Sequence, residues 1–434
     1  MKLRALPVVL LVVFSACHED TPAPITPPPP PVTPPPPPPV VPDPEITLLT
    51  FKQDVSSSTS FSDDWIFVTK ENGDVLGINH FEAEETIVLK SDKVKASDKI
   101  NVTIFHYRQP TTETIDFTSY LGITPGQTWV YNKIGGAVPT KTGTATLKIV
   151  NAPVSVVPLP VTVSTNLGHS STTGATPTSV SIPLYKSTER ILARINLNNT
   201  PSYFESNNVQ DGVTFEADYT TDFKPLENIF TIDLSGIDAF LGNVHAITNE
   251  TGVDPYYING FLNYSYTVYT TPATAKSYKW GYNSGYDLYR TSFGIGVGKS
   301  SLQYFKLGSP VTTIPFPNHT FTPAKKELNG FAFTISGDYQ LRNSRWTVSI
   351  PDYQAVLSWR VYSPADGKQV FPKIPDEIKN LYPLLSIESL ILKDNAFTNH
   401  LDGFTYADFI NGQMNISSSK KAYSVEYQKA IFQE

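Results

Sequence analysis

Cysteine is almost absent from this chain of 434 residues, in which Cys17 is the only one. Intrachain disulfide bonds are therefore excluded, and so are zinc sites built from several cysteines. Charge is sparse as well, because 17% of the residues are charged and the formal net charge is −7. No stripe of Lys and Arg is visible, and counterion release requires clustered cations. The composition therefore argues against a nucleic-acid partner.

Long apolar runs are also missing. The apolar run at residues 6–14 is far shorter than the ~20 residues that a membrane-spanning helix needs. It follows the cationic residues Lys2 and Arg4, and small residues come after it. This layout is typical of a secretory signal peptide, which we predict at residues 1–16.

The residues "FSAC", which end at Cys17, resemble the lipobox of bacterial lipoproteins. Phe14 stands where Leu is more usual in that motif. The resemblance implies cleavage before Cys17, a thioether-linked lipid on its sulfur and acylation, as by palmitate, of the new amino terminus. Several acyl chains exceed the one-chain threshold for stable membrane anchoring. The membrane is thus an expected partner, through lipidated Cys17.

The residues that follow the cysteine indicate a location. The sorting signal of bacterial lipoproteins lies directly after the lipidated cysteine. An Asp at that position is typical of retention in the inner membrane, but here the residue is His18. Glu19 and Asp20 resemble a signal that exports lipoproteins to the outer face in some Gram-negative bacteria. We therefore expect an outer-membrane protein that faces the cell exterior.

Proline dominates the next stretch, and residues 17–44 are predicted to be the lipidated cysteine and a stalk. Fixed φ angles and missing N–H groups exclude helix and sheet from a run of prolines. The remaining conformation is solvated polyproline II, which is a semi-rigid spacer.

The remaining chain has the period-two alternation of short strands, separated by Gly, Pro and Asn. The pair Asn72-Gly73 between two alternating segments is a strong signal for a hairpin. We predict an all-β fold of two or three antiparallel sandwich-like or barrel-like modules. Residues 45–235 are expected to form a sandwich region of one or two modules, and residues 236–434 a larger, tyrosine-rich antiparallel domain.

Two short helices are expected near the C-terminus. Pro375, followed by two acidic residues, is typical of a helix start, and Pro383 of its end. Thr405 and Asp408 have the spacing of a capping box, and Asn411-Gly412 would end that second helix.

Motifs for catalysis are mostly absent. Neither HExxH nor Gly-x-Ser-x-Gly occurs, and Phe293 stands where a phosphate loop ending at Gly298 would need glycine. Glu216, Asp218 and Asp222 are close in sequence, and such carboxylates can hydrolyse glycosides, bind calcium or lie on a solvated strand face. We therefore predict no catalytic residue, no metal and no cofactor.

Tyrosine is dense between residues 256 and 289. Aromatic residues on one strand face can stack sugars or peptides, but they can equally form cross-strand pairs or a core. The candidate ligand-binding residues are Tyr264, Tyr266, Trp280, Tyr282 and Tyr286.

Three functions are compatible with these features. The first is a non-catalytic, surface-tethered binding module for a glycan, a peptide or another envelope component. The second is a structural or adhesive subunit, resembling a pilus or assembly lipoprotein, which would need an open strand edge. The third is a hydrolase with carboxylates that the sequence does not pair.

Overall fold

The computed structural model describes residues 44–53, 62–82, 84–108, 114–131, 140–154, 159–165, 167–174, 179–197, 199–247, 264–265, 268–270, 277–325, 328, 331–350, 355–365, 370–383, 385, 387–415 and 424–433. The chain divides into two compact units, Met1–Pro42 and Asp43–Glu434. The predicted signal peptide, Cys17 and nearly all of the predicted stalk lie outside the described residues. The description below concerns the second unit.

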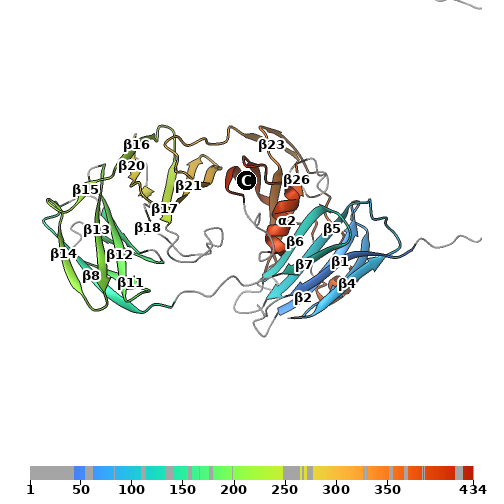
Figure 1. Cartoon of the computed structure of the whole chain (residues 1–434). Helices are drawn as coiled ribbons and strands as arrows, with labels where there is room; N and C mark the ends of the chain where they lie inside the picture. The colour runs from blue at the N-terminus through green and yellow to red at the C-terminus, as the bar shows by residue number, and fades with distance from the viewer. Residues whose placement is uncertain are drawn as a thin grey trace, which may run out of the picture. The chain divides into compact units, whose positions relative to one another are not determined.

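The second unit is all-β, as predicted, with several multi-stranded sheets and short helices near the C-terminus (Figure 1). Its two described helices are α1 (Asp376–Leu381) and α2 (Tyr406–Met414).

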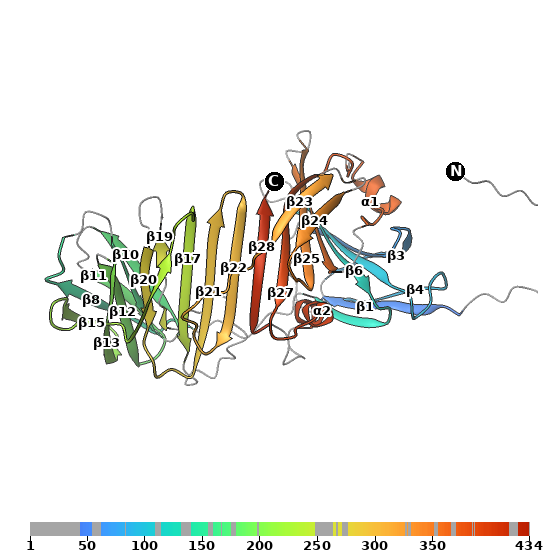
Figure 2. The ribbon, with the colours of Figure 1, turned by 90° about the horizontal axis from the view of Figure 1, so that it is seen from above.

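A single large sheet connects most of this unit, and Figure 2 shows its strands β17, β21, β22, β28 and β27 side by side. Its described strands, in spatial order, are β18 (Tyr264–Ser265), β17 (Ala239–Ile247), β21 (Leu288–Val297), β22 (Ser300–Gly308), β28 (Glu426–Gln433), β27 (Ile391–His400), β25 (Leu341–Ile350), β26 (Ala355–Pro364), β6 (Thr114–Ile123), β5 (Ile100–Arg108), β2 (Ser62–Lys70) and β3 (Val75–His80). A further short strand, β19 (Val268–Thr270), pairs with β17.

One end of the large sheet forms a sandwich with a small N-terminal sheet. The strands of the small sheet are, in order, β4 (Thr86–Ser91), β1 (Ile46–Gln53) and β7 (Gln127–Tyr131). Apolar residues of β1, such as Phe51, pack there against Val102 and Ile104 of β5. Ile410 and Met414 of α2 belong to the same core, so the helix closes one side of this sandwich.

A second sandwich follows in the chain. Its five-stranded sheet comprises β10 (His169–Gly174), β9 (Leu159–Ser164), β12 (Thr188–Leu197), β13 (Thr200–Gln210) and β15 (Lys224–Pro225). Its three-stranded sheet comprises β11 (Ser179–Leu184), β8 (Gly143–Val150) and β14 (Thr214–Asp218). Alternating residues of both sheets, for example Leu147 and Ile195, are fully buried between them.

The other face of the large sheet carries two more cores. A two-stranded ribbon, β16 (Asn228–Asp233) with β20 (Ser277–Tyr282), packs on Phe293 of β21 and Tyr304 of β22. Farther along the sheet, α1 and the hairpin of β23 (Thr320–Lys325) and β24 (Ala332–Ser336) contribute to a core around Trp346 and Trp359.

Not every pairing is antiparallel. Three described pairs are parallel, namely β1 with β7, β8 with β14, and β6 with β26. A tight turn can join only antiparallel strands, whereas parallel strands need a longer connection. The two strands of each of these parallel pairs are far apart in the chain, so no tight turn joins them. Because β6 pairs with β26, the large sheet crosses the boundary expected at residues 235–236. That boundary remains a prediction.

The local turn signals have mixed outcomes. Asn72-Gly73 does form the hairpin between β2 and β3, with Gly73 at a φ of 89°. Thr405 and Asp408 do form a reciprocal capping box at α2. The expected end of α2 at Asn411-Gly412 is wrong, because the helix continues to Met414, which is fully buried. Burial of that last turn outweighs the low helix propensity of glycine.

Candidate functional site

The tyrosine-rich segment is the first candidate, and only part of it is described. Tyr266 lies outside the described residues, and for Tyr264 only the backbone, in β18, is described. Trp280, Tyr282 and Tyr286 have exposed fractions of 0%, 8% and 9%. These three side chains are therefore buried, and the solvent-facing aromatic surface expected from the sequence is not formed by them.

Packing between strands explains this correction. Trp280 of β20 makes edge-to-face contacts with Phe230 of β16, at a ring-centroid distance of 5.2 Å, and with Phe293 of β21, at 4.7 Å. The aromatic spacing indicated a shared strand face, but it did not show that the β16–β20 ribbon turns this face toward the large sheet. Trp280, Tyr282 and Tyr286 belong to a hydrophobic core.

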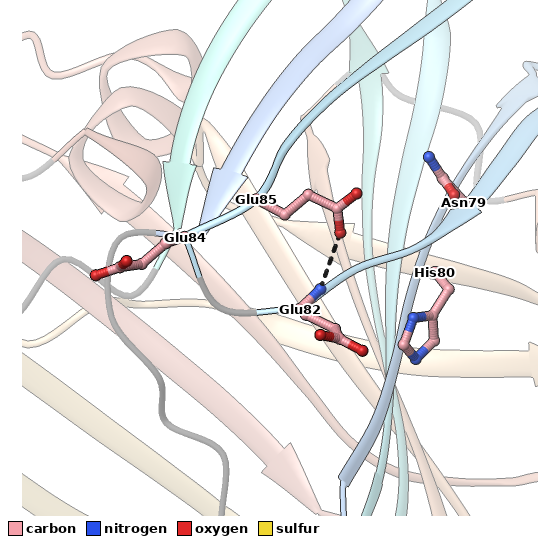
Figure 3. Close-up of a pocket in the computed structure, with 5 residues that line it drawn as sticks. All are labelled: Asn79, His80, Glu82, Glu84 and Glu85. Atoms are coloured by element: carbon pink, nitrogen blue, oxygen red, sulfur yellow. Dashed lines mark hydrogen bonds between the residues drawn. The ribbon is translucent and has the colours of Figure 1, made fainter.

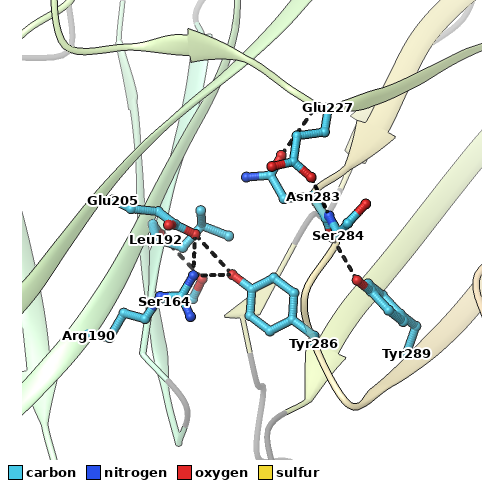
Figure 4. Close-up of polar contacts among 9 residues, drawn as sticks. All are labelled: Ser164, Arg190, Leu192, Glu205, Glu227, Asn283, Ser284, Tyr286 and Tyr289. Carbon is cyan, nitrogen blue, oxygen red and sulfur yellow. Dashed lines mark hydrogen bonds and ion pairs between the residues drawn. The ribbon is translucent and has the colours of Figure 1, made fainter.

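Tyr286 joins two sheets by polar contacts, which Figure 4 shows. Its hydroxyl donates to Oε1 of Glu205 at 3.0 Å, and Nη2 of Arg190 donates to the same oxygen at 2.9 Å. The Arg190 guanidinium lies 5.1 Å from the centre of the Tyr286 ring. Because Arg190 and Glu205 lie on β12 and β13, the cluster ties the second sandwich to the turn after β20.

A second set of contacts stabilises the same turn (Figure 4). The carboxylate of Glu227 accepts the backbone N–H of Ser284 at 2.7 Å, and the hydroxyl of Tyr289 donates to the carbonyl of Asn283 at 2.8 Å. These groups hold the turn in place and do not face a described cavity. We interpret both sets as structural.

An open depression beside β3 is the second candidate. It has a volume of about 590 Å³ and is lined by Asn79, His80, Glu82, Glu84 and Glu85 (Figure 3). Glu85 is engaged by its own loop, because its carboxylate accepts the backbone N–H of Glu82 at 3.3 Å. His80 Nε2 lies 3.0 Å from Oδ1 of Asp63. Within the described part of the chain, no group of three or more His, Cys, Asp or Glu side chains is arranged to hold a metal ion. The depression is acidic, which disfavours an anion.

A buried Asp–His–Tyr chain of hydrogen bonds lies close by. Oδ1 of Asp64 is 2.6 Å from Nδ1 of His106, and Nε2 of His106 is 3.1 Å from the hydroxyl of Tyr131. Asp64 and His106 are each 7% exposed. The chain links β2 and β5 of the large sheet to β7 of the small sheet. It satisfies buried polar groups inside the sandwich, as expected for a core-edge histidine.

The carboxylates considered from the sequence do not form a pair. Glu216 is engaged with Lys148, at 2.5 Å between Oε1 and Nζ. Asp218 accepts from Thr220, whose side-chain hydroxyl is the main cause of the lowered pKa of Asp218, and from Asn151. Asp222 accepts the backbone N–H of Asp218. Each carboxylate therefore organises a local turn or a strand pair.

The third candidate is a set of residues on the large sheet that we call the basic aromatic row: Arg290, Phe305, Tyr427, Lys429 and His400. Strand alternation places the row on the side of the sheet opposite to Phe293 and Tyr304. Phe305 and Tyr427 are directly paired on β22 and β28, with ring centroids 5.1 Å apart and planes at 15°. The Arg290 guanidinium lies 5.8 Å from the centre of the Phe305 ring.

Several cations lie in and around this row. Arg290, Phe305, Tyr427 and Lys429 are half-buried, and burial lowers the pKa of Arg290 and of Lys429. Arg345 and Arg360, paired on β25 and β26, lie on the same side of the sheet. Carboxylates lie on this side as well: Asp394 is 2.6 Å from Nη2 of Arg345, and Asp116 lies near Arg360. Asp402 and Asp408 lie near His400. The sequence showed no such cluster, because its members come from six strands between β21 and β28.

Comparisons with known proteins give no family for this chain: no family model, no curated protein and no solved structure matches it. Among the described residues, no helix combines the length and apolarity needed to cross a membrane.

Proposed function

We propose that this chain is a lipoprotein of the bacterial outer membrane, anchored through a lipid on Cys17, whose β ectodomain faces the exterior and binds a ligand without converting it. The lipobox-like residues, the proline-rich stretch and the acidic pair after Cys17 support the anchoring and the location.

The ligand that we propose is a polyanionic glycan, and the basic aromatic row is its binding surface. The observation that carries this proposal is the gathering of Arg290, Lys429, Arg345 and Arg360 on one side of a continuous sheet in a chain with a net charge of −7. Partly desolvated cations interact with anions more strongly than fully solvated ones. Stacked rings such as Phe305 and Tyr427 cover one another's faces and present their edges, which carry partial positive charge.

The spacing favours a polymer over a small anion. Arg290 on β21 and Arg345 on β25 are four strands apart in the sheet, which is ~19 Å across the strands. Repeated carboxylates or sulfates along a linear glycan could reach both. A peptide is less well suited, because peptides commonly bind at a sheet edge through main-chain hydrogen bonds, whereas this surface is a sheet face.

The proposal can be tested by measuring how the full mature chain, kept in detergent, binds polygalacturonate. The methyl-esterified polymer, which is uncharged, is the control ligand. We expect binding to the acid form that weakens with salt, and at least tenfold weaker binding after Arg290→Gln with Lys429→Gln. Lys306→Gln, on the other face of the sheet, is the matched control and should bind normally. Equal binding of the two polymers, or no loss in the double variant, would overturn the proposal.

The same experiment separates the other functions. Release of new reducing ends from the polymer would indicate a hydrolase. An adhesive or assembly subunit would need an open strand edge, and one edge, that of β7, is occupied by hydrogen bonds of the Asn415 side chain to Thr128 and Val130. The basic aromatic row leads us to favour the binding function.

A further inference from the structure

A buried arginine that has no counter-charge among the described residues lies on the large sheet, on the side opposite to the basic aromatic row. Arg342 of β25 is 4% exposed, and its Nε and Nη2 have no hydrogen-bond partner in the described part of the chain. Its guanidinium lies 5.0 Å from the centre of the Phe333 ring. A cation–π contact offsets only part of the free energy of desolvating a guanidinium. Burial accordingly lowers the pKa of Arg342 to about 10.

Two neutral polar side chains lie on the strands that flank this arginine. Ser363 of β26 is directly opposite Arg342, it is fully buried, and its hydroxyl has no hydrogen-bond partner among the described residues. Asn395 of β27 is also fully buried, and neither atom of its amide has a partner among these residues. Asn395 is two residues from Phe397, the cross-strand partner of Arg342, so it is a diagonal neighbour of the arginine. Diagonal neighbours are ~7–8 Å apart at the backbone, within reach of a long side chain.

Aromatic side chains of the β23–β24 hairpin cover this cluster; Figure 2 shows the hairpin beside β25 and β27. Phe321 and Phe333 lie 5.6 Å and 5.7 Å from the ring of Phe397. Buried polar groups are nearly always satisfied, and three neighbouring exceptions need a common explanation. All three can donate a hydrogen bond, and one of them carries a positive charge.

We propose that Arg342, Ser363 and Asn395 form a buried site for one small monovalent anion, of the size of chloride. Such an ion would accept from the guanidinium, the hydroxyl and the amide, and it would neutralise the buried charge. The near-complete burial of the three residues excludes a glycan from this site. The inference therefore stands independently of the proposed polyanion surface.

Chloride itself is the probe. Thermal unfolding of the full mature chain should be measured in sodium chloride and in sodium gluconate at equal ionic strength, since gluconate is too large for a closed site. We expect a Tm that rises with the logarithm of chloride concentration, because a ligand bound only by the folded state stabilises it by mass action. Broadening of the chloride-35 resonance by the protein gives a direct readout of binding.

Three variants make the test specific. Arg342→Met should abolish the chloride response without lowering stability in gluconate, because it removes the uncompensated charge and keeps apolar volume. Ser363→Ala should weaken chloride binding about tenfold, because one hydrogen bond to a charged group is lost. This variant replaces Arg342→Met in the test if the methionine variant does not fold. Arg345→Met, on the same strand but the opposite face, should keep the chloride response while weakening polyanion binding.

A wild-type chain whose Tm and chloride resonance do not respond to chloride would overturn the inference. An unchanged response in both Arg342→Met and Ser363→Ala would overturn it as well, because the ion would then bind elsewhere.

Discussion

Asn415 and Val130 are 285 residues apart, yet the side-chain oxygen of Asn415 accepts the backbone N–H of Val130 at 3.1 Å. The amide nitrogen of Asn415 donates to the carbonyl of Thr128, also at 3.1 Å. Val130 and Thr128 lie on β7, whose other edge pairs with β1. The amide of Asn415 thus replaces a neighbouring strand, and an edge that is capped in this way is protected from pairing with another chain.

Replacing Asn415 by Ala should destabilise the protein and open this edge. Two hydrogen bonds to the β7 backbone are lost, and we expect a decrease of ~1–3 kcal/mol in the free energy of unfolding. Urea unfolding measures the decrease, and light scattering at increasing concentration detects self-association. Asn207→Ala, at an exposed position of β13, is the control and should change neither. A variant with the stability and the light scattering of the wild type would contradict the role assigned to Asn415.

Truncating Trp280 to Ala should affect folding. The side chain is fully buried against Phe230 and Phe293, and large-to-small changes at such sites cost ~3–5 kcal/mol. Denaturant unfolding gives the change, and glycan binding by the folded fraction should stay normal. Normal stability combined with lost binding would show instead that Trp280 contacts the ligand.

His400 should make the protein sensitive to mild acid. Burial lowers the pKa of His400 below its ordinary value, although the carboxylates of Asp402 and Asp408 oppose this shift. The unfolded chain therefore takes up a proton near pH 6.5, while the folded chain does so only at lower pH. The free energy of unfolding should fall as the pH drops below about 6.5, down to the pKa of the folded state.

Urea unfolding between pH 8 and pH 5 tests this dependence. His400→Phe removes the titrating group and should flatten the curve. An identical pH dependence in His400→Phe and the wild type would assign the acid sensitivity to other groups.

Cys17→Ser should prevent lipid attachment. Since the predicted thioether needs the Cys17 sulfur, metabolic labelling with palmitate should disappear and the protein should leave the membrane fraction. Protease added to intact cells should remove the wild-type ectodomain if it faces outward. Continued labelling of the serine variant would refute the lipobox interpretation, and full protection of the wild type would refute the exterior location.

Local signals in the sequence were sufficient for the fold class and for several turns. Alternating apolar residues predicted strands, because side chains of a strand point to opposite sides in turn. Asn72-Gly73 and the Thr405–Asp408 pair were informative because a hairpin turn and a capping box each depend on residues within one short segment. These features need no information from the rest of the chain.

Pairing between distant strands decided everything that concerns a site. Period-two spacing predicts that Trp280 and Tyr282 share a face, but whether this face meets solvent or another sheet depends on where the β16–β20 ribbon packs. Arg290, Phe305 and Tyr427 come together only because β21, β22 and β28 are neighbours, and Arg342 meets Ser363 and Asn395 only through β26 and β27. Contacts between residues far apart in the chain depend on strand order and register, which follow from the burial of all strands at once.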